Sequence, residues 1–454
     1  MARKCLALIL AAGEGTRMRS KMPKVLHSVA GLPMISHVMR VSAKAECDAV
    51  AVVAGNGAAT VTKAVQEERP DTEVFEQTKR LGTAHAVLAA RKALDAGYDD
   101  ILVLFGDTPL LKPETLLQMR SVLAEGAAVV VLGFRAKDPT GYGRLLESDD
   151  KLLAIREDRD ANDEERNINF CNGGIMALDG ALATKLLDAV GNDNAKGEHY
   201  LTDVVEIANR EGYSVAAIEA DETEVMGVNT REDLAEVEAI WQSSARKNLL
   251  LSGVTMHAPE TVFLHADTHI EPDVVLEPNL VFGPGVQIRA GARIRPFSHL
   301  EGAIVGKNVE IGPYARIRPG TNLESGAKVG NFVEIKNAHV ASGAKVNHLS
   351  YIGDAEIGEK ANVGAGTITC NYDGINKHKT IIGAGAFIGS NSALVAPVTI
   401  GDGAYVASGS VIVEDVPNDG LAMARGKQTN KLGRAKEIRD RNARIKEKRL
   451  NKSD

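Results

Sequence analysis

The segment Leu10-Ala-Ala-Gly-Glu-Gly-Thr-Arg17, which continues to Lys24, has the residue types and spacing of a phosphate-binding loop. Gly13 and Gly15 allow backbone amides to approach a ligand closely, and a loop that leads from a strand into a helix points those amides at an anion. The segment is not a dinucleotide fingerprint, because the third glycine is missing, and not a P-loop, because no GKS or GKT follows. Arg17 and Lys24 add cations that can neutralise a triphosphate and a leaving pyrophosphate.

A second reactive group in the same half is the carboxylate of Asp107, which follows the apolar run from Ile101 to Phe105. A side chain at the end of such a strand emerges at the carboxyl edge of the sheet, where open α/β domains bind ligands. A hard oxygen ligand there suits Mg²⁺. An aspartate that closes a strand can equally cap the next helix, so position alone leaves both interpretations open.

The C-terminal half has its own candidate site, around an interruption of a six-residue repeat. The repeat lapses from Cys370 to Thr380 and resumes at Ile382, and an insertion in a regular array is where function tends to be added. Reactive side chains on the repeats nearby are Arg318, Lys336, His348, Tyr351 and Asn362. A single exposed Arg or Lys is more often only a solvated charge. A lone histidine is more often structural, and His339 and His378 are interpreted in that way.

The repeat itself predicts the element that positions these residues. An aliphatic residue recurs every six positions from Val305 to Ile335 and again from Ile382 to Ile412, and an earlier run from Ile270 to Leu300 keeps the same register. This period excludes a helix, whereas six-residue units with one inward aliphatic residue stack into a parallel β-helix. After a one-residue slip the pattern continues at Val340, Val346 and Ile352. The repeats are predicted to run from about residue 262 to 414.

The N-terminal half has a different pattern. Short apolar runs are separated by segments long enough for helices, namely Leu6 to Leu10, Ala49 to Ala54, Ile101 to Phe105 and Val129 to Phe134. Such runs predict a mostly parallel, Rossmann-like sheet that is buried on both faces, in an α/β domain over residues 1–229. Thr230-Arg-Glu-Asp233 predicts a capping box, which opens a linker helix over 230–253 with Leu234, Val237 and Trp241 on one face. The β-helix and a basic tail then occupy residues 254–454.

The composition limits the class of protein. The chain has 454 residues, which is too long for one core, and its 44% hydrophobic and 25% charged residues are ordinary for a globular protein. Four cysteines without CxxC spacing argue against a disulfide framework and a zinc site, and they favour a reducing cytoplasm. The net charge of -7 argues against general nucleic-acid binding, and the first apolar run is too short to span a membrane.

These motifs resemble those of two families. The segment from Leu10 to Lys24 is similar to the nucleotide-sugar pyrophosphorylase signature LxxAAGxGTRM with a following PKxL. The repeats resemble the left-handed β-helix of acetyl-CoA-dependent acyltransferases, which are usually trimers with sites between subunits. Further motifs match in order: Gln77, Leu81 to Ala86, Phe105 to Asp107, Gly141 to Arg144, Glu157, Asn172 to Gly174, Gly197 to Asp203 and Gly227 to Asn229.

Over nearly the whole chain, the combination resembles a bacterial family of bifunctional enzymes. Its members are N-acetylglucosamine-1-phosphate uridylyltransferases and glucosamine-1-phosphate N-acetyltransferases. They acetylate glucosamine 1-phosphate with acetyl-CoA and then couple the product to UTP, which releases pyrophosphate. The resemblance therefore implies synthesis of UDP-N-acetylglucosamine, a precursor of peptidoglycan and lipopolysaccharide, by a cytoplasmic homotrimer.

The resemblance also assigns residues in the N-terminal site. Asp107 and Asn229 would bind Mg²⁺, and Arg17 and Lys24 would neutralise charge while the sugar phosphate attacks the α-phosphorus of UTP directly. Gln77, Gly82 and Thr83 would hold the uracil end, and Gly141, Glu157 and Asn172 would hold N-acetylglucosamine. The complete nucleotide and product set is Leu10, Ala11, Ala12, Gly13, Lys24, Gln77, Gly82, Thr83, Gly141, Glu157, Asn172 and Asn229.

In the C-terminal site, the resemblance makes His348 the general base for the 2-amine of glucosamine 1-phosphate, because imidazole has a suitable pKa. Arg318, Lys336 and Lys377 would bind the sugar phosphate, and Tyr351 and Asn362 would orient the sugar. The residues that would bind acetyl-CoA are Ala365, Asn371, Tyr372, Ser390, Ser408 and Arg425.

The chain departs from the family pattern at Thr78-Lys-Arg80 and at Ala84, where acidic or amide residues and glycine are more familiar. The basic tail from Lys431 to Asp454 is interpreted first as a solvated helix, then as a cover for coenzyme A phosphates, and last as a nucleic-acid binder. Two rival functions remain open at this point. One is a nucleotidyltransferase whose β-helix only oligomerises or regulates, and the other is a scaffold without activity.

Overall fold

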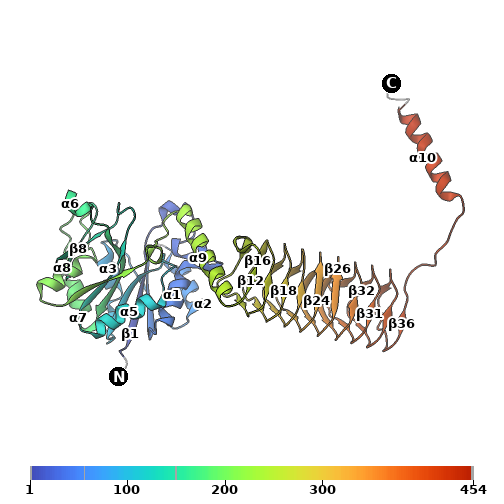
Figure 1. Ribbon diagram of the computed structural model, residues 1–454, viewed down its shortest axis with the longest axis horizontal. Helices are drawn as coiled ribbons and strands as arrows, with labels where there is room; N and C mark the ends of the chain where they lie inside the picture. Colours follow the sequence, from blue (N-terminus) through green and yellow to red (C-terminus); the bar gives the residue numbers. More distant parts are fainter. Residues whose placement is uncertain (1–2, 56, 149–150, 451–454) are drawn as a thin grey trace. The chain divides into compact units, whose positions relative to one another are not determined.

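The computed structural model describes residues 3–55, 57–148 and 151–450. By its internal contacts the chain divides into two units, Met1–His269 with Val281–Gly285, and Ile270–Leu280 with Val286–Asp454. Figure 1 shows a sheet covered by helices in the first unit and stacked coils in the second.

A twisted sheet organises the first unit, with strand order β11-β7-β10-β6-β1-β4-β5 and the hairpin β8-β9 beside β10. Strand β1 pairs in parallel with β4 and β6, whereas β10 runs antiparallel to β6 and β7. The strands are β1 (Cys5–Ala11), β4 (Ala49–Ala54), β5 (Glu73–Glu76), β6 (Asp100–Phe105), β7 (Val129–Arg135), β8 (Arg144–Ser148), β9 (Lys151–Arg156), β10 (Phe170–Asp179) and β11 (Val215–Ala220). The prediction of a mostly parallel α/β sheet is confirmed.

Side chains of β1 alternate between two apolar cores, which explains why its sequence is apolar at every position. Leu6, Leu8 and Leu10 pack into one core, and Ala7 and Ile9 pack into the other. The helices that supply these cores and the neighbouring segments are α1 (Met34–Lys44), α2 (Ala58–Glu68), α3 (Thr83–Ala89), α4 (Arg91–Leu94), α5 (Pro113–Ala124), α6 (Asp163–Arg166), α7 (Gly180–Asp188) and α8 (Asp203–Arg210).

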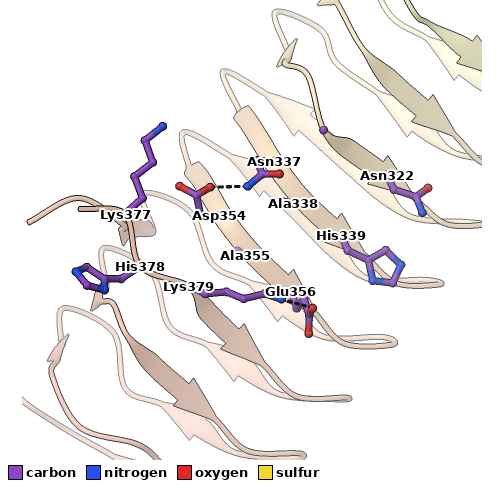
Figure 2. Close-up of a pocket in the computed structure, with 11 residues that line it drawn as sticks. Asn322, Asn337, Ala338, His339, Asp354, Ala355, Glu356, Lys377, His378 and Lys379 are labelled. Atoms are coloured by element: carbon purple, nitrogen blue, oxygen red, sulfur yellow. Dashed lines mark hydrogen bonds and ion pairs between the residues drawn. The ribbon is translucent and has the colours of Figure 1, made fainter. Parts of the chain in front are cut away.

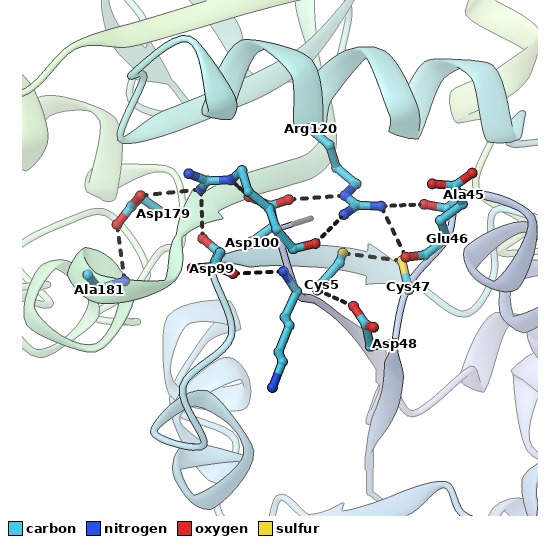
Figure 3. Close-up of polar contacts among 12 residues, drawn as sticks. Cys5, Ala45, Glu46, Cys47, Asp48, Asp99, Asp100, Arg120, Asp179 and Ala181 are labelled. Carbon is cyan, nitrogen blue, oxygen red and sulfur yellow. Dashed lines mark hydrogen bonds and ion pairs between the residues drawn. The ribbon is translucent and has the colours of Figure 1, made fainter. Parts of the chain in front are cut away.

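A buried carboxylate fixes the amino ends of β1 and β6. Asp100 is fully buried, and its carboxylate accepts hydrogen bonds from the Nε atoms of Arg3, at 2.7 Å, and Arg120, at 3.0 Å. Arg120 also donates to the carbonyl oxygens of Ala45, at 2.8 Å, and Arg3, at 2.9 Å. Figure 3 shows this network joining segments far apart in the chain. It lies at the end of the sheet opposite the carboxyl edge of β1 and β6.

Helix α9 (Arg231–Leu251) begins with the predicted capping box, in which Thr230 and Asp233 bond reciprocally. Val237 is buried on its inner face, with Leu234 and Trp241 packed beside it as predicted. The buried amide of Gln242 donates to the carbonyl oxygen of Leu264 at 2.7 Å and accepts from the amide of Leu264 at 2.9 Å. Short strands of this unit near the helix are β2 (Ser28–Val29), β3 (Leu32–Pro33), β12 (Thr255–Met256) and β13 (Val262–Phe263).

The second unit is a parallel β-helix. The strands of one face are β15 (Val275–Leu276), β18 (Arg293–Ile294), β21 (Glu310–Ile311), β24 (Lys328–Asn331), β26 (Lys345–His348), β28 (Asn362–Val363), β31 (Phe387–Ile388), β34 (Tyr405–Val406) and β36 (Leu421–Ala422). The predicted inward positions from Val305 to Ile335 are 0–1% exposed. The six-residue prediction is confirmed, and β36 extends the coils beyond residue 414.

The other faces consist of strands that pair in parallel from coil to coil. These strands are β14 (His269–Ile270), β16 (Leu280–Phe282), β17 (Gln287–Ile288), β19 (His299–Leu300), β20 (Ala303–Val305), β22 (Arg316–Ile317), β23 (Thr321–Leu323), β25 (Glu334–Val340), β27 (Tyr351–Ile357), β29 (Ile368–Cys370), β30 (Thr380–Ile382), β32 (Ala393–Val395), β33 (Val398–Ile400) and β35 (Val411–Ile412).

Coil lengths explain the slip and the insertion. Glu310 pairs with Lys328, which is a coil of 18 residues or three hexapeptides. Lys328 pairs with Lys345, which shortens the coil by one residue at the predicted slip. Asn362 pairs with Phe387, 25 residues on, because this coil carries the inserted loop.

The C-terminal helix α10 (Arg434–Leu450) is exposed over residues 434–448, in agreement with a solvated helix. Across residues 3–55, 57–148 and 151–450, each helix is either too short or too polar to cross a membrane.

We expect Asp100→Ala to lower the free energy of unfolding strongly, because it leaves Arg120 and Arg3 without their buried partner. Removal of one member of a buried ion pair costs roughly 3–5 kcal/mol. Urea unfolding of the full chain, followed by circular dichroism, measures the effect. Lys92→Ala serves as the control, because it removes an exposed ion pair with Glu73 and should change stability by less than about 1 kcal/mol. Equal stability of the two variants would contradict this account.

Candidate active sites

A pocket of about 400 Å³ opens at the carboxyl edge of the sheet in the first unit. Leu10 of β1 pairs with Phe105 of β6, so the loops that follow these two strands begin side by side. Ten predicted residues line the pocket: Leu10, Ala11, Ala12, Gly13, Lys24, Gln77, Gly82, Thr83, Asp107 and Asn229.

Lys24, Asp107 and Asn229 meet at one end of this pocket. The ammonium group of Lys24 contacts the carboxylate of Asp107 and donates to Oδ1 of Asn229 at 3.1 Å. The backbone amide of Val228 donates to the carbonyl oxygen of Asp107 at 3.0 Å, which holds the two segments together. Helix α5 begins at Pro113 without a side-chain cap, so the alternative role of Asp107 as a helix cap is wrong.

The donor set at this end fits a hard divalent cation. The carboxylate of Asp107 and the amide oxygen of Asn229 both face the Lys24 ammonium, so one cation already lies where their oxygens converge. Mg²⁺ needs only one or two protein oxygens when phosphate and water complete its coordination. Within the described part of the chain, no three His, Cys, Asp or Glu side chains gather as a metal cluster. These two oxygens therefore suit a cation that arrives with a phosphate ligand.

The glycines of the first loop have different roles. Gly15 has φ +61°, and a Cβ there would lie 2.8 Å from Cβ of Lys24. Glycine at this position therefore allows the backbone of Lys24 to pack closely against the loop. A Cβ on Gly13 would meet no protein atom within 4 Å, which leaves its backbone open toward the pocket. Arg17, in the short helix η1 (Thr16–Met18), is exposed and does not line the pocket.

Another part of the lining comes from the segment after β5, which contributes Gln77, Arg80, Gly82 and Thr83. Gln77 donates from Nε2 to the carbonyl oxygen of Gly82 at 3.2 Å. Gly82 has φ +117°, and a Cβ there would lie 2.3 Å from the carbonyl oxygen of His199, so no larger residue fits. The hydroxyl of Thr83 accepts from the amide of Leu201 at 2.9 Å, which fixes the start of α3.

The predicted sugar residues lie close to one another but not in that pocket. Glu157 and Asn172 flank Gly143, since a Cβ there would lie 3.6 Å from Oε1 of Glu157 and 3.5 Å from Cβ of Asn172. Glu157 lines a separate pocket of about 450 Å³. Burial raises the pKa of Glu157, although the hydroxyl of Thr202, 3.3 Å away, favours the charged form. Gly141 has φ +84° and open space around its α-carbon.

In the second unit, coil register places His348 in a column with three predicted acetyl-CoA residues. Val346 pairs with Val363 of the next coil. His348 and Ala365 each lie two residues further along the chain, so Ala365 is the counterpart of His348 in the next coil. The same register continues through Val363–Ile388 and Ile388–Val406. Further positions in the column are Ser390 and Ser408. In the last coil Val406 pairs with Ala422, so Ala424 is the counterpart of Ser408. Arg425 follows Ala424 and donates to the carbonyl oxygen of Ser408 at 2.8 Å.

One coil before His348, the column contains Asn331, whose Oδ1 lies 2.5 Å from Nδ1 of His348. An amide oxygen accepts, so this contact assigns the ring proton to Nδ1 and leaves Nε2 as the basic nitrogen. The His348 residue is exposed.

Three predicted cations converge on the neighbouring face. The close approach of Lys377 lowers the pKa of Lys336, and the charge of Arg318 adds to this effect. Arg318 is held by Oε1 of Glu334 at 2.7 Å. Mutual repulsion among these cations would be relieved by a bound phosphate, which fits an anion site.

A pocket of about 430 Å³ adjoins this cluster, and Figure 2 shows its lining from successive coils and from the inserted loop. Asp354 accepts from the amide of Asn337 at 2.6 Å and from Asn371 at 2.5 Å. Burial raises the pKa of Asp354, but these two hydrogen bonds and the charges of Lys377 and Lys336 outweigh it, so the net shift is downward.

Three further predicted residues have different surroundings. Asn362 lies in β28. Its backbone pairs with Lys345 of the preceding coil and with Phe387 of the following coil. Tyr372 is exposed in the inserted loop, and its hydroxyl donates to the carbonyl oxygen of Gly374. Tyr351 lies with Asn371 over Gly353, where a Cβ would meet the Tyr351 hydroxyl at 2.5 Å.

Sequence reasoning missed four residues of these sites, of which Asn331 contacts His348. Arg80 and Glu198 line the first pocket, and Asp354 holds Asn371 at the second. Glu198 falls within the matched motif Gly197 to Asp203, which is the signal that could have identified it. Arg80 was noticed only as a departure from the family pattern.

Comparisons with known proteins agree with both halves of the structure. Residues 7–168 match the MobA-like NTP transferase domain, and residues 379–414 match the bacterial transferase hexapeptide of six repeats. The "Bifunctional protein GlmU" of Chelativorans sp. is 60% identical over 98% of this chain and 99% of its own length. The chain belongs to the GlmU family.

Other GlmU relatives match over a similar span. Those of Brucella anthropi and Azorhizobium caulinodans are 59% and 58% identical, over 98% and 96% of this chain and 98% of each relative. The predicted family is thereby confirmed, as is a nucleotidyltransferase domain followed by hexapeptide repeats. Each of these relatives matches nearly the whole chain, so the similarity covers both halves of the sequence.

Proposed function

We propose that the chain makes UDP-N-acetylglucosamine in two steps at two separate sites. Acetyl-CoA first acetylates glucosamine 1-phosphate at the β-helix, and the product then attacks UTP in the N-terminal domain. The observation that carries the proposal is that a Lys24–Asp107–Asn229 pocket and a His348 column beside three cations occur in one chain. A scaffold without activity would need neither the residues of the pocket nor those of the His348 column.

The acetyl transfer uses groups that the β-helix aligns. Nε2 of His348 removes a proton from the 2-amine of glucosamine 1-phosphate as the amine attacks the thioester carbon, and coenzyme A leaves as its thiol. Asn331 holds the imidazole ring in the required tautomer. Arg318, Lys336 and Lys377 bind the sugar phosphate, and Ala365, Ser390 and Ser408 of the column bind acetyl-CoA together with Arg425. Tyr351, Asn362, Asn371 and Tyr372 complete the two substrate subsites.

Uridylyl transfer is catalysed by aligning the two substrates and neutralising their charge, and no covalent enzyme intermediate forms. A phosphate oxygen of N-acetylglucosamine 1-phosphate attacks the α-phosphorus of UTP, and pyrophosphate leaves. Mg²⁺ bound by Asp107 and Asn229 would supply charge neutralisation at the phosphates. Lys24 and Arg17 stabilise the pyrophosphate, Gln77, Gly82 and Thr83 bind uracil, and Gly141, Glu157 and Asn172 bind the sugar.

The functional domains are proposed as residues 1–229 for uridylyl transfer, 230–253 as a linker helix, and 254–454 for acetyl transfer. We propose a cytoplasmic enzyme, because UTP and acetyl-CoA are cytoplasmic metabolites, and one without a nucleic-acid partner, because the net charge is -7. Its product would serve as a precursor of peptidoglycan and lipopolysaccharide. Three left-handed β-helices would pack around an axis, with Asn371, Lys377 and the basic tail serving the site of a neighbour.

Asp107→Ala should abolish uridylyl transfer and leave acetyl transfer unchanged, because the proposed metal ligand belongs to one domain only. A loss of at least about a hundredfold is expected, since a bound metal contributes several kcal/mol to such a step. Separate assays with UTP plus N-acetylglucosamine 1-phosphate, and with acetyl-CoA plus glucosamine 1-phosphate, measure both rates. Asp71→Ala, which removes an exposed carboxylate paired with Arg69, is the control. Full uridylyl transfer by Asp107→Ala would remove Asp107 from the site.

His348→Ala should reduce acetyl transfer by roughly a hundredfold to ten-thousandfold, which is the usual contribution of a general base. Uridylyl transfer should be unaffected. The matched control is His299→Ala, because His299 is exposed on β19 of the same β-helix and does not line the pocket beside the cation cluster. The same two assays at neutral pH decide the outcome. If both histidine variants retained the parent acetyl-transfer rate, His348 could not be the base.

Light scattering of the full chain should give three times the monomer mass of 48.2 kDa. If neighbouring subunits share the acetyl-transfer site, Lys377→Ala and His348→Ala chains mixed after dissociation should partly recover activity, since some interfaces then hold both native residues. A monomer with full acetyl transfer would overturn the shared-site proposal.

A further inference from the structure

Arg80 lines the first pocket, although the family pattern offers no role for an arginine there. Its guanidinium forms an ion pair with the carboxylate of Glu14. Glu14 stands between Gly13 and Gly15 in the first loop, whereas Arg80 belongs to the segment between β5 and α3. The pair therefore connects two walls of the pocket, the glycine loop and the wall that contains Gln77 and Gly82.

The charge balance of this pocket is unfavourable for a triphosphate while the pair persists. The charged residues that line it, within the described ranges, are Lys24, Arg80, Asp107 and Glu198. Lys24 is already engaged by Asp107 and Asn229, and Arg17 does not line the pocket. Both Lys24 and Arg80 are cations that line the pocket. The partner of Lys24 also lines it, whereas Glu14, the partner of Arg80, does not.

The pair is also poorly placed to serve stability. The side chains of Arg80 and Glu14 are 45% and 55% exposed. Exposed ion pairs contribute about 0–1 kcal/mol, so this contact breaks at little cost. A phosphate offers the guanidinium several acceptor oxygens and bidentate geometry in place of one carboxylate.

We propose that Arg80 exchanges Glu14 for the phosphates of UTP when the nucleotide binds, and that Glu14 is a competing anion that sets nucleotide affinity. This inference rests on the proposed uridylyl transfer at the same pocket. Arg80 is a nucleotide-positioning residue, and the Glu14–Arg80 pair is the nucleotide-free arrangement. The two partners of the pair therefore have opposite effects on affinity, which a purely structural ion pair would not produce.

Calorimetric titration of the full chain with UTP in the presence of Mg²⁺ tests the exchange without requiring turnover. Arg80→Gln should bind UTP about tenfold more weakly, since a hydrogen bond to a charged group is lost. Glu14→Gln should bind UTP roughly two- to fivefold more tightly, since only an exposed pair is removed. The double variant should match Arg80→Gln, because Glu14 acts only through Arg80. The loss in Arg80→Gln should be smaller for UMP than for UTP.

Lys79→Gln is the matched control, because it removes the adjacent cation, which does not line the pocket. It should bind UTP as the parent does. Equal weakening by Glu14→Gln and Arg80→Gln would overturn the exchange and make the pair a structural bridge. Parent-like affinity of Arg80→Gln would also overturn it. If the parent itself failed to bind UTP, the proposed uridylyl transfer would fail first, so the two failures are distinguishable.

Discussion

In-register pairing of parallel strands is the constraint on which both candidate sites depend. In the first unit, the alignment of β1 with β6 brings the glycine loop beside Asp107, although they are nearly 100 residues apart in the chain. In the second, coil pairing stacks His348 under Ala365 and beside Asn331. A slip of one residue would turn each of these side chains to the opposite face. The buried aliphatic positions of both units therefore fix the chemistry as well as the fold.

In the first unit, the residues that stabilise the sheet and the residues that line the pocket lie at opposite ends of the strands. The Asp100 network closes the amino ends of β1 and β6, where its groups are buried and satisfied. The carboxyl ends instead hold Lys24 and Asp107 in a pocket, together with glycines whose conformation or close contacts exclude a side chain. In the β-helix, regular coils supply stability, and the 25-residue coil supplies the inserted loop. Functional groups thus occupy the positions that the apolar periodicity does not constrain.

Apolar patterns alone could predict the two fold classes, because strands of the first sheet are apolar on both faces, whereas in the β-helix every sixth residue must face inward. They placed Ile335 and Val340 correctly on either side of the slip, and both are buried in β25. The capping box at Thr230 was equally local and was confirmed. Convergence of Arg318, Lys336 and Lys377 could not be derived from spacing, since Lys377 reaches the cluster through an irregular loop. Arg17 was grouped with Lys24 by proximity in sequence, yet only Lys24 lines the pocket.

In the proposed function, one chain carries two independent transfer sites linked by a diffusible product. Mixing the Asp107→Ala and His348→Ala proteins tests it most directly, with glucosamine 1-phosphate, acetyl-CoA, UTP and Mg²⁺ supplied together. Neither protein alone should form UDP-N-acetylglucosamine at an appreciable rate, and the mixture should, because one makes the acetylated intermediate and the other consumes it. Failure of the mixture, while the parent converts all three substrates, would contradict two separable sites.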